Sequence, residues 1–269
     1  MVRKITSFFL AATLLVACSK NAITGRSQLK LLPESELQSM AVQQYQQFLS
    51  ENKVVSSSSD RDAEMVRRVG QRLSNAVEQY FASKGLQDQL QGYKWEYNLV
   101  DNKEANAWCM PGGKIVVYTG LLPYTQNEAG LAIVLGHEIT HAVFQHGNER
   151  MSQQMIQQGL GEALSVAVSS KPSLTQNIFL QAFGVGSTLG ILKFSRADES
   201  EADHYGLIWA AIAGYNPQQA IPFWERMAQQ SNASRPPEFL SDHPSDERRI
   251  ADIKKWVPEA MKYYKPIGK

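Results

Sequence analysis

The sequence predicts a mainly α-helical protein of the α+β class, in which a small β-sheet with a hairpin precedes a central helix. Apolar residues recur at spacings of three and four through most of the chain, whereas strand patterns are confined to residues 93–118. Of the 269 residues, 43% are hydrophobic and 20% are charged, as in globular proteins. The formal net charge of +1 argues against a surface for nucleic acid, so we expect no nucleic-acid partner.

Residues 1–17 have the pattern of a signal peptide, with two basic residues followed by an apolar run and no acidic residue. That run is shorter than the roughly 20 residues that a membrane-spanning helix needs. The last three residues of this segment and the next one, Leu15-Val16-Ala17-Cys18, resemble the lipobox of bacterial lipoproteins, in which the cysteine is acylated. We therefore expect a lipoprotein of the bacterial cell envelope, attached to the membrane through Cys18 and placed in the outer membrane facing the periplasm. Ordinary cleavage, with Cys18 incidental, is the alternative.

Two amphipathic helices are predicted after a short polar tether. The first covers residues 32–52 and begins at Pro33. The second begins at Ser59 or Asp60, both of which are good N-caps, and ends near Gly85. A serine run at 56–59 separates them.

The predicted sheet follows. Tyr93–Val100 alternates apolar and polar residues, and 106–118 contains two short runs around Pro111-Gly112-Gly113, which is typical of a hairpin turn. Cys109 lies in the first of these runs and is expected to be buried as a small apolar residue.

The remaining chain reads as helices, over residues 127–146, 150–169, 175–192, 196–213, 217–230 and 245–263. Ile178–Leu192 is the most apolar of these segments. It suits a buried helix or helical hairpin, with a membrane-contacting element as the alternative.

A metal-binding motif stands within the central helix. His137-Glu138-Ile139-Thr140-His141 has the pattern H-E-x-x-H. Residues four apart share a helix face, so both imidazoles can reach one tetrahedral zinc ion. Glu138 is turned about 100° away, where it can act on water as a general base without being a ligand. Two histidines on a helix surface are the bland alternative.

A third ligand is expected from the acidic stretch at 195–204. Glu199 and Asp203 are four apart and share a face, whereas Glu201 points away from them. Glu199 therefore suits a zinc ligand, and Asp203 suits an acceptor for a ligand histidine's N–H. Glu201 remains the second choice of ligand.

These residues resemble one family. The H-E-x-x-H motif followed by Glu199-x-x-x-Asp203, the Pro111-Gly112-Gly113 turn and His243-Pro244 with Arg249-Ile250 are similar to the gluzincin-type metallopeptidases related to the CAAX prenyl protease and HtpX, the forty-eighth metallopeptidase family. The similarity covers about residues 60–260, and the lipobox favours the periplasmic lipoprotein branch. The implied organisation is a signal peptide at 1–17, a lipidated tether and helix at 18–60, and a zinc metallopeptidase domain at 61–265.

The resemblance implies zinc bound by His137, His141 and Glu199, with Glu138 as general base and Asp203 behind the ligands. It further implies that His243 can approach the fourth zinc position and hold the enzyme latent, with Arg249 near the site. From the residues alone, His243 lies in a loop ahead of a helix, free to swing, or is an ordinary histidine at a helix start. His243 and Arg249 are also the candidates for stabilising the oxyanion.

Three further expectations concern other residues. His146 is expected to cap a helix C-terminus, and His204 to be structural. The strand Lys114–Tyr118 is expected to pair with an extended peptide substrate.

The predicted function is a lipid-anchored zinc metalloendopeptidase acting on unfolded or misassembled envelope proteins, with the outer-membrane assembly machinery as a further partner. A zinc-stabilised chaperone or assembly factor, whose main task is client binding, is the alternative. A helical scaffold with a fortuitous motif is the third, and it predicts no bound zinc.

Overall fold

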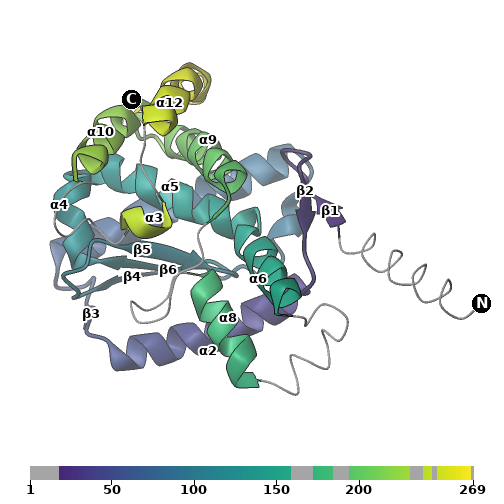
Figure 1. The fold of residues 1–269 in the computed structure, drawn as a ribbon. Coiled ribbons are helices and arrows are strands. Elements are labelled where there is room, and N and C mark those ends of the chain that lie inside the picture. Colours follow the sequence, from purple (N-terminus) through teal and green to yellow (C-terminus); the bar gives the residue numbers. More distant parts are fainter. Residues whose placement is uncertain (1–17, 159–171, 184–193, 231–238, 244–246, 268–269) are drawn as a thin grey trace, which may run out of the picture.

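The computed structural model describes residues 18–158, 172–183, 194–230, 239–243 and 247–267, and within them it confirms a mainly helical fold with a small sheet (Figure 1). The strands are β1 (Cys18–Lys20), β2 (Ser27–Leu29), β3 (Val54–Val55), β4 (Glu96–Val100), β5 (Ala107–Met110) and β6 (Lys114–Tyr118). The helices are α2 (Glu34–Glu51), α3 (Arg61–Ser83), α4 (Leu122–Thr125), α5 (Glu128–Val143), α6 (His146–Gln157), α8 (Pro172–Ala182), α9 (Arg196–Ile212), α10 (Ala220–Gln230), α11 (Phe239–Asp242) and α12 (Glu247–Ala260).

The main sheet has the strand order β3-β4-β6-β5. β4 and β6 are parallel, whereas β5 and β6 form the predicted antiparallel hairpin. Its turn contains Gly112 and Gly113 at φ 76° and 81°, a backbone region that glycine adopts without steric cost. Because β6 is paired on both sides, the expectation that Lys114–Tyr118 pairs with a substrate is wrong. Among the described strands, β5 forms the edge of the sheet next to β6, and the two-residue β3 forms the opposite edge.

Both faces of this sheet are covered, so every residue of β5 and β6 is buried. On one face, alternate residues such as Cys109 and Ile115 join a core shared with α3, α5, α9, α10 and α12. On the other, Trp108 and Val116 pack with residues of α2, α6 and α8. Figure 1 shows the sheet between α5 above and α2 below. The expectation that Cys109 is buried is confirmed.

The segment after Cys18 is not the short polar tether that the sequence predicts. β1 and β2 pair antiparallel, with Cys18 opposite Leu29, and the hairpin lies against α6. Gln28 is buried and donates from Nε2 to the Phe144 carbonyl at 2.9 Å. These strands have only three residues each and few apolar side chains, so they carry no strand pattern, and contacts distant in sequence hold them in place.

Several predicted helices have different bounds in the structure. The helix predicted from residue 150 begins at His146, and residues 159–169 of that prediction lie outside the described part. In the apolar segment 178–192, Ile178, Phe179 and Phe183 are buried, and residues 184–192 lie outside the described part. No described helix combines the length and apolar character that a membrane span requires.

Close packing of α5 on α9 brings the two halves of the site together. A Cβ on Gly206 would lie 2.8 Å from the His137 backbone nitrogen, and one on Gly136 would lie 2.7 Å from the Gly206 carbonyl oxygen. Real Cβ contacts are essentially never this short, so both positions need glycine for the backbones to approach. The H-E-x-x-H residues therefore lie directly beside the acidic face of α9.

Candidate active site

Helix α5 holds the motif rigidly in the interior. Asn127 caps its N-terminus, accepting a hydrogen bond from the Gly130 N–H at 2.9 Å. From Gly130 to Val143 every residue is buried, and most are apolar. His137, Glu138 and His141 therefore place three ionisable groups in a helix that is otherwise apolar, which costs free energy unless each group has a partner.

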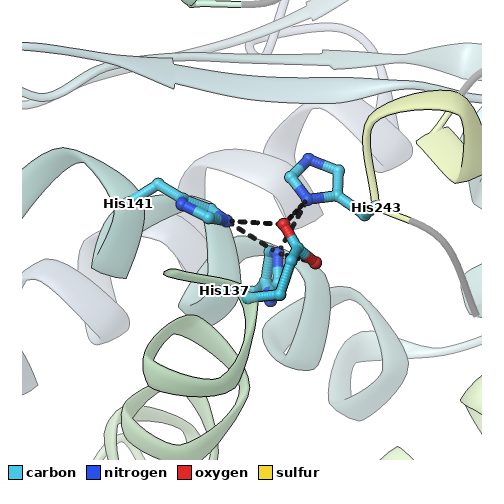
Figure 2. A group of neighbouring side chains, drawn as sticks. His137, His141 and His243 are labelled. Atoms are coloured by element: carbon cyan, nitrogen blue, oxygen red, sulfur yellow. Dashed lines mark hydrogen bonds and ion pairs between the residues drawn. The ribbon is translucent and has the colours of Figure 1, made fainter. Parts of the chain in front are cut away.

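Those partners converge on one point. Nε2 of His137 lies 3.0 Å from Nε2 of His141 and 3.0 Å from Nδ1 of His243. Glu199 Oε1 lies 2.8 Å from His243 Nδ1 and 3.4 Å from His141 Nε2. Figure 2 shows the three imidazoles turned toward one another.

The start of α9 supplies the carboxylates. Ser195 and Asp198 form a capping box, in which each side chain accepts from the other's backbone N–H. One turn of helix then places Glu199 and Asp203 on the face toward α5, and Asp203 Oδ1 lies 2.9 Å from His137 Nδ1. Glu201, the second choice of ligand, faces a different cluster and lies 3.0 Å from His146.

Arg249 connects the two carboxylates. It donates from Nε and Nη2 to the two oxygens of Asp203, both at 2.7 Å, and its Nη1 lies 3.0 Å from Glu199 Oε2. Its guanidinium also stacks over the Trp224 ring, 3.5 Å from the centroid. Arg249 is thus held beside the cluster of candidate metal ligands, His137, His141, Glu199 and His243, which is called the ligand cluster below.

These contacts set the protonation states. Burial lowers the pKa of both His137 and His141 well below the ordinary value, which favours the neutral imidazoles that bind metals. Burial by itself would raise the pKa of Glu199, but His243, Arg249 and His137 outweigh it and hold this pKa well below its usual range. Burial raises the pKa of Asp203 to about 6 although Arg249 opposes the shift, so Asp203 is ionised at neutral pH.

His243 differs most from its expected setting. One interpretation of the sequence places it in a loop, free to swing. In the structure it directly follows the helical turn α11, and its backbone N–H donates to the Phe239 carbonyl at 3.0 Å. It is 3% exposed, and its Nε2 lies 3.3 Å from Glu138 Oε1. The imidazole therefore lies inside the cluster, in contact with the carboxylates of Glu138 and Glu199.

The cluster suits zinc in its chemistry and spacing. Zinc takes imidazole nitrogen and carboxylate oxygen at about 2.0–2.2 Å in a tetrahedron, which places neighbouring ligand atoms roughly 3.3–3.5 Å apart. Among His137, His141, Glu199 and His243, five of the six pairs have donor separations from 2.8 Å to 3.7 Å, and all four donors lie within 4.8 Å of one another. His137, His141, Glu199 and His243 together form a group that can hold a metal ion.

Two of the expectations about other histidines have different outcomes. His204 pairs with Glu259 at 2.8 Å and stacks on Trp256, away from the cluster, in keeping with a structural role. His146 does not cap a helix C-terminus; it begins α6 and its Nδ1 lies 2.9 Å from Nδ1 of His141. The only signal for this contact was its position five residues after His141.

Several known proteins are similar to this chain in sequence. The chain is 34% identical over 190 residues to the mitochondrial metalloendopeptidase OMA1 of Schizosaccharomyces pombe, covering 70% of this chain and 53% of the relative. It is 37% identical over 182 residues to OMA1 of Saccharomyces cerevisiae, covering 65% and 50%. The β-barrel assembly-enhancing protease of Escherichia coli is 32% identical over 167 residues, covering 60% and 34%.

The chain spans about half the length or less of these curated relatives. The model of peptidase family M48 matches residues 67–257, which include every residue of the ligand cluster and Arg249. The resemblance that the sequence motifs indicated is therefore confirmed: this chain belongs to peptidase family M48.

Proposed function

We propose that this protein is a zinc-dependent metalloendopeptidase. The observation that carries the proposal is the convergence of His137, His141 and Glu199 on one point, with the Glu138 carboxylate lining the same cleft as His141. His137, His141 and Glu199 are the proposed ligands, and Asp203 orients His137 by accepting its Nδ1–H.

Zinc bound there supplies a Lewis acid that polarises the scissile carbonyl and acidifies water. Glu138 accepts the proton of the attacking water and returns it to the leaving amine. Of the two expected oxyanion partners, Arg249 is unsuited, because Asp203 and Glu199 engage its guanidinium. His243, with Nε2 next to Glu138, is the candidate that remains, and this role is the alternative to the latent one described below.

The substrate is proposed to lie along β5. In the hairpin, the Asn106 carbonyl accepts from the Tyr118 N–H and the Met110 carbonyl from the Gly113 N–H. Successive residues of a strand direct their backbone N–H and C=O groups to opposite sides. The backbone groups of Ala107 and Cys109 therefore point away from β6, toward the edge of the sheet. Residues 107–109 line the cleft that also contains Glu138 and His141. An extended peptide paired with this edge would cross the ligand cluster, and backbone pairing selects for unfolded segments more than for sequence.

The α11 segment supports a latent resting state. The Phe239 N–H donates to the Ala105 carbonyl at 3.0 Å, so this segment already uses the end of the edge that a substrate would need. His243 follows it into the ligand cluster and takes the place of a fourth ligand. Substrate binding is proposed to displace both.

The proposed setting is the bacterial envelope, with the chain anchored through Cys18 in the outer membrane facing the periplasm and with unfolded or misassembled envelope proteins as substrates. The lipobox-like residues 15–18 support the anchor. The printed name of the Escherichia coli relative, a β-barrel assembly-enhancing protease, supports substrates among assembling outer-membrane proteins.

The test is Glu138→Gln, which keeps shape and removes the base. We expect one zinc per chain in both proteins and a fall in casein cleavage of about 10²–10⁴-fold. Glu225→Gln is the control, because Glu225 is 46% exposed and forms a surface ion pair with Lys254. A purified Glu138→Gln protein that cleaves at the wild-type rate would refute the mechanism.

The same relative's name also favours the alternative, an assembly factor whose main task is client binding. The two functions separate in a complementation test. If Glu138→Gln fully restores a deletion strain while lacking protease activity in vitro, client binding is the main task.

A further inference from the structure

A second polar cluster lies behind the metal ligand His141. The His146 ring stands between the His141 ring and α9, with its Nδ1 2.9 Å from His141 Nδ1 and its Nε2 3.0 Å from Glu201 Oε2. The His146 side chain is 0% exposed. No role for His146 follows from the proposed mechanism.

The backbone at the α5–α6 junction is shaped to produce this contact. Gln145 adopts φ 59° and ψ 34°, the left-handed region that residues other than glycine rarely enter. The chain reverses there, so that α6 begins with the His146 ring over His141. Such backbone strain persists only where the surrounding structure enforces it.

The hydrogen bonds fix which nitrogen carries each proton. Glu201 is an ion-paired carboxylate and can only accept, so His146 donates from Nε2. In the His146 tautomer whose proton is on Nε2, Nδ1 accepts a hydrogen bond, and His141 then donates from its own Nδ1. His141 is left with its lone pair on Nε2, the atom that faces His137 and Glu199. Phe194 stacks on the His141 ring at 3.7 Å between centroids and limits its tilt.

Arg26 holds the far end of this chain of contacts. Its Nε donates to Glu201 Oε2 at 2.9 Å, and its two other nitrogens contact Glu149 and Asp198. His146, Asp198 and Glu201 have spacings that would suit a metal ion. The Arg26 guanidinium, however, already forms ion pairs with both carboxylates, so this cluster needs no second metal. Arg26 lies in the β1–β2 hairpin, which begins at Cys18.

We propose that His146 is a positioning residue for the zinc ligand His141, and that Arg26, through Glu201, ties the N-terminal hairpin to the metal centre. This relay, Arg26–Glu201–His146–His141, serves His141 as Asp203 serves His137. It rests on the proposed function only in taking His141 as a zinc ligand. Partners of this kind typically change metal affinity by about 10–100-fold.

The first test is His146→Phe, which keeps a ring and removes the acceptor. We expect the zinc dissociation constant, measured by competition with a chelator, to rise about 10–100-fold, and the visible spectrum of the Co²⁺-substituted protein to change. His146→Asn should recover most of the affinity, because its side-chain oxygen can accept near the position of Nδ1. His204→Phe is the matched control, since the partly exposed His204 pairs with Glu259 and stacks on Trp256, away from the cluster, and it should leave both readouts unchanged.

The second test is Arg26→Gln, compared with Lys20→Gln at an exposed position of the same hairpin. Arg26→Gln should weaken zinc binding by up to about tenfold, and Lys20→Gln should not. Adding Arg26→Gln to His146→Phe should cause little further loss, because the two act through one relay. Because Arg26 is partly exposed, Arg26→Gln should fold, and it tests the relay even if His146→Phe does not fold.

The outcomes separate the two proposals. A wild-type protein that binds no zinc refutes the proposed function and the relay together. A wild-type protein that binds zinc and cleaves casein, with His146→Phe and Arg26→Gln binding zinc as tightly as wild type, refutes the relay alone. Additive losses in the double variant would refute the link between the hairpin and His141.

Discussion

Replacement of Arg249 by methionine should reveal how strongly the stability of the protein depends on the cation that pairs with Asp203 and Glu199. Methionine keeps an apolar side chain of similar length but leaves Asp203 without the two hydrogen bonds that it now accepts at 2.7 Å. The side chain of Asp203 is only 3% exposed, so water cannot replace them. Breaking a buried ion pair from one side costs about 3–5 kcal/mol.

The assay is urea unfolding at neutral pH with a chelator present, so that zinc binding does not contribute to the free energy of unfolding. The free energy of unfolding should fall by about 3–5 kcal/mol in Arg249→Met. Arg249→Lys should show most of this decrease, because an ammonium cannot donate the same pair of parallel hydrogen bonds. Arg248→Met is the control; Arg248 is 71% exposed, and its change should stay within about 0.5 kcal/mol. Equal losses for Arg249→Met and Arg248→Met would refute the reasoning.

Three more predictions follow from particular contacts. Gly206→Ala places a methyl group against the α5 backbone. Overpacking costs about 1–3 kcal/mol, and the higher helix propensity of alanine offsets up to about 1 kcal/mol of this, so the midpoint of thermal unfolding should fall. An unchanged midpoint would contradict the close approach of the two helices. Burial raises the pKa of Glu34 to about 8, so the folded state holds a proton that the unfolded state has already lost above about pH 4.5, and stability falls as pH rises toward 8. In urea unfolding, the free energy of unfolding of Glu34→Gln should therefore match that of wild type near pH 4.5 and exceed it by about 1–2 kcal/mol at pH 8.5, a figure discounted for the partial exposure of Glu34. An equal difference at both pH values would contradict this prediction. His243→Ala should weaken zinc binding but increase casein cleavage at saturating zinc if His243 blocks the fourth position, whereas a tenfold or larger loss would assign it to the oxyanion instead.

Local periodicity predicted the core of the site. The spacing of four between His137 and His141 and between Glu199 and Asp203 places each pair on one helix face, whatever the rest of the fold does. The same periodicity turns Glu201 away from Glu199, and the structure indeed places it in the other cluster. These predictions succeeded because they depend on helix geometry alone.

Predictions that depended on neighbours in space were less successful. The sequence could not tell which strand of the hairpin lies at the edge, because β4 pairs with β6 in parallel after a crossover, and the pattern of apolar residues is the same for either order. His146 looked like a helix C-cap because the reversal at Gln145 has no signature in its residue type. His243 looked mobile because the contacts that bury it come from α5 and α9.

The sequence by itself therefore determined the helical class, the H-E-x-x-H helix and the helix face that Glu199 shares with Asp203 but not with Glu201, since each follows from the 3.6-residue repeat over short distances. Only the tertiary structure decided that β5 forms an edge of the sheet, that Arg249 lies beside the ligands, and that Arg26 reaches Glu201 across 175 residues of chain. Such contacts depend on how α5 and α9 pack through Gly136 and Gly206 and on where the N-terminal hairpin docks. No local pattern encodes those positions.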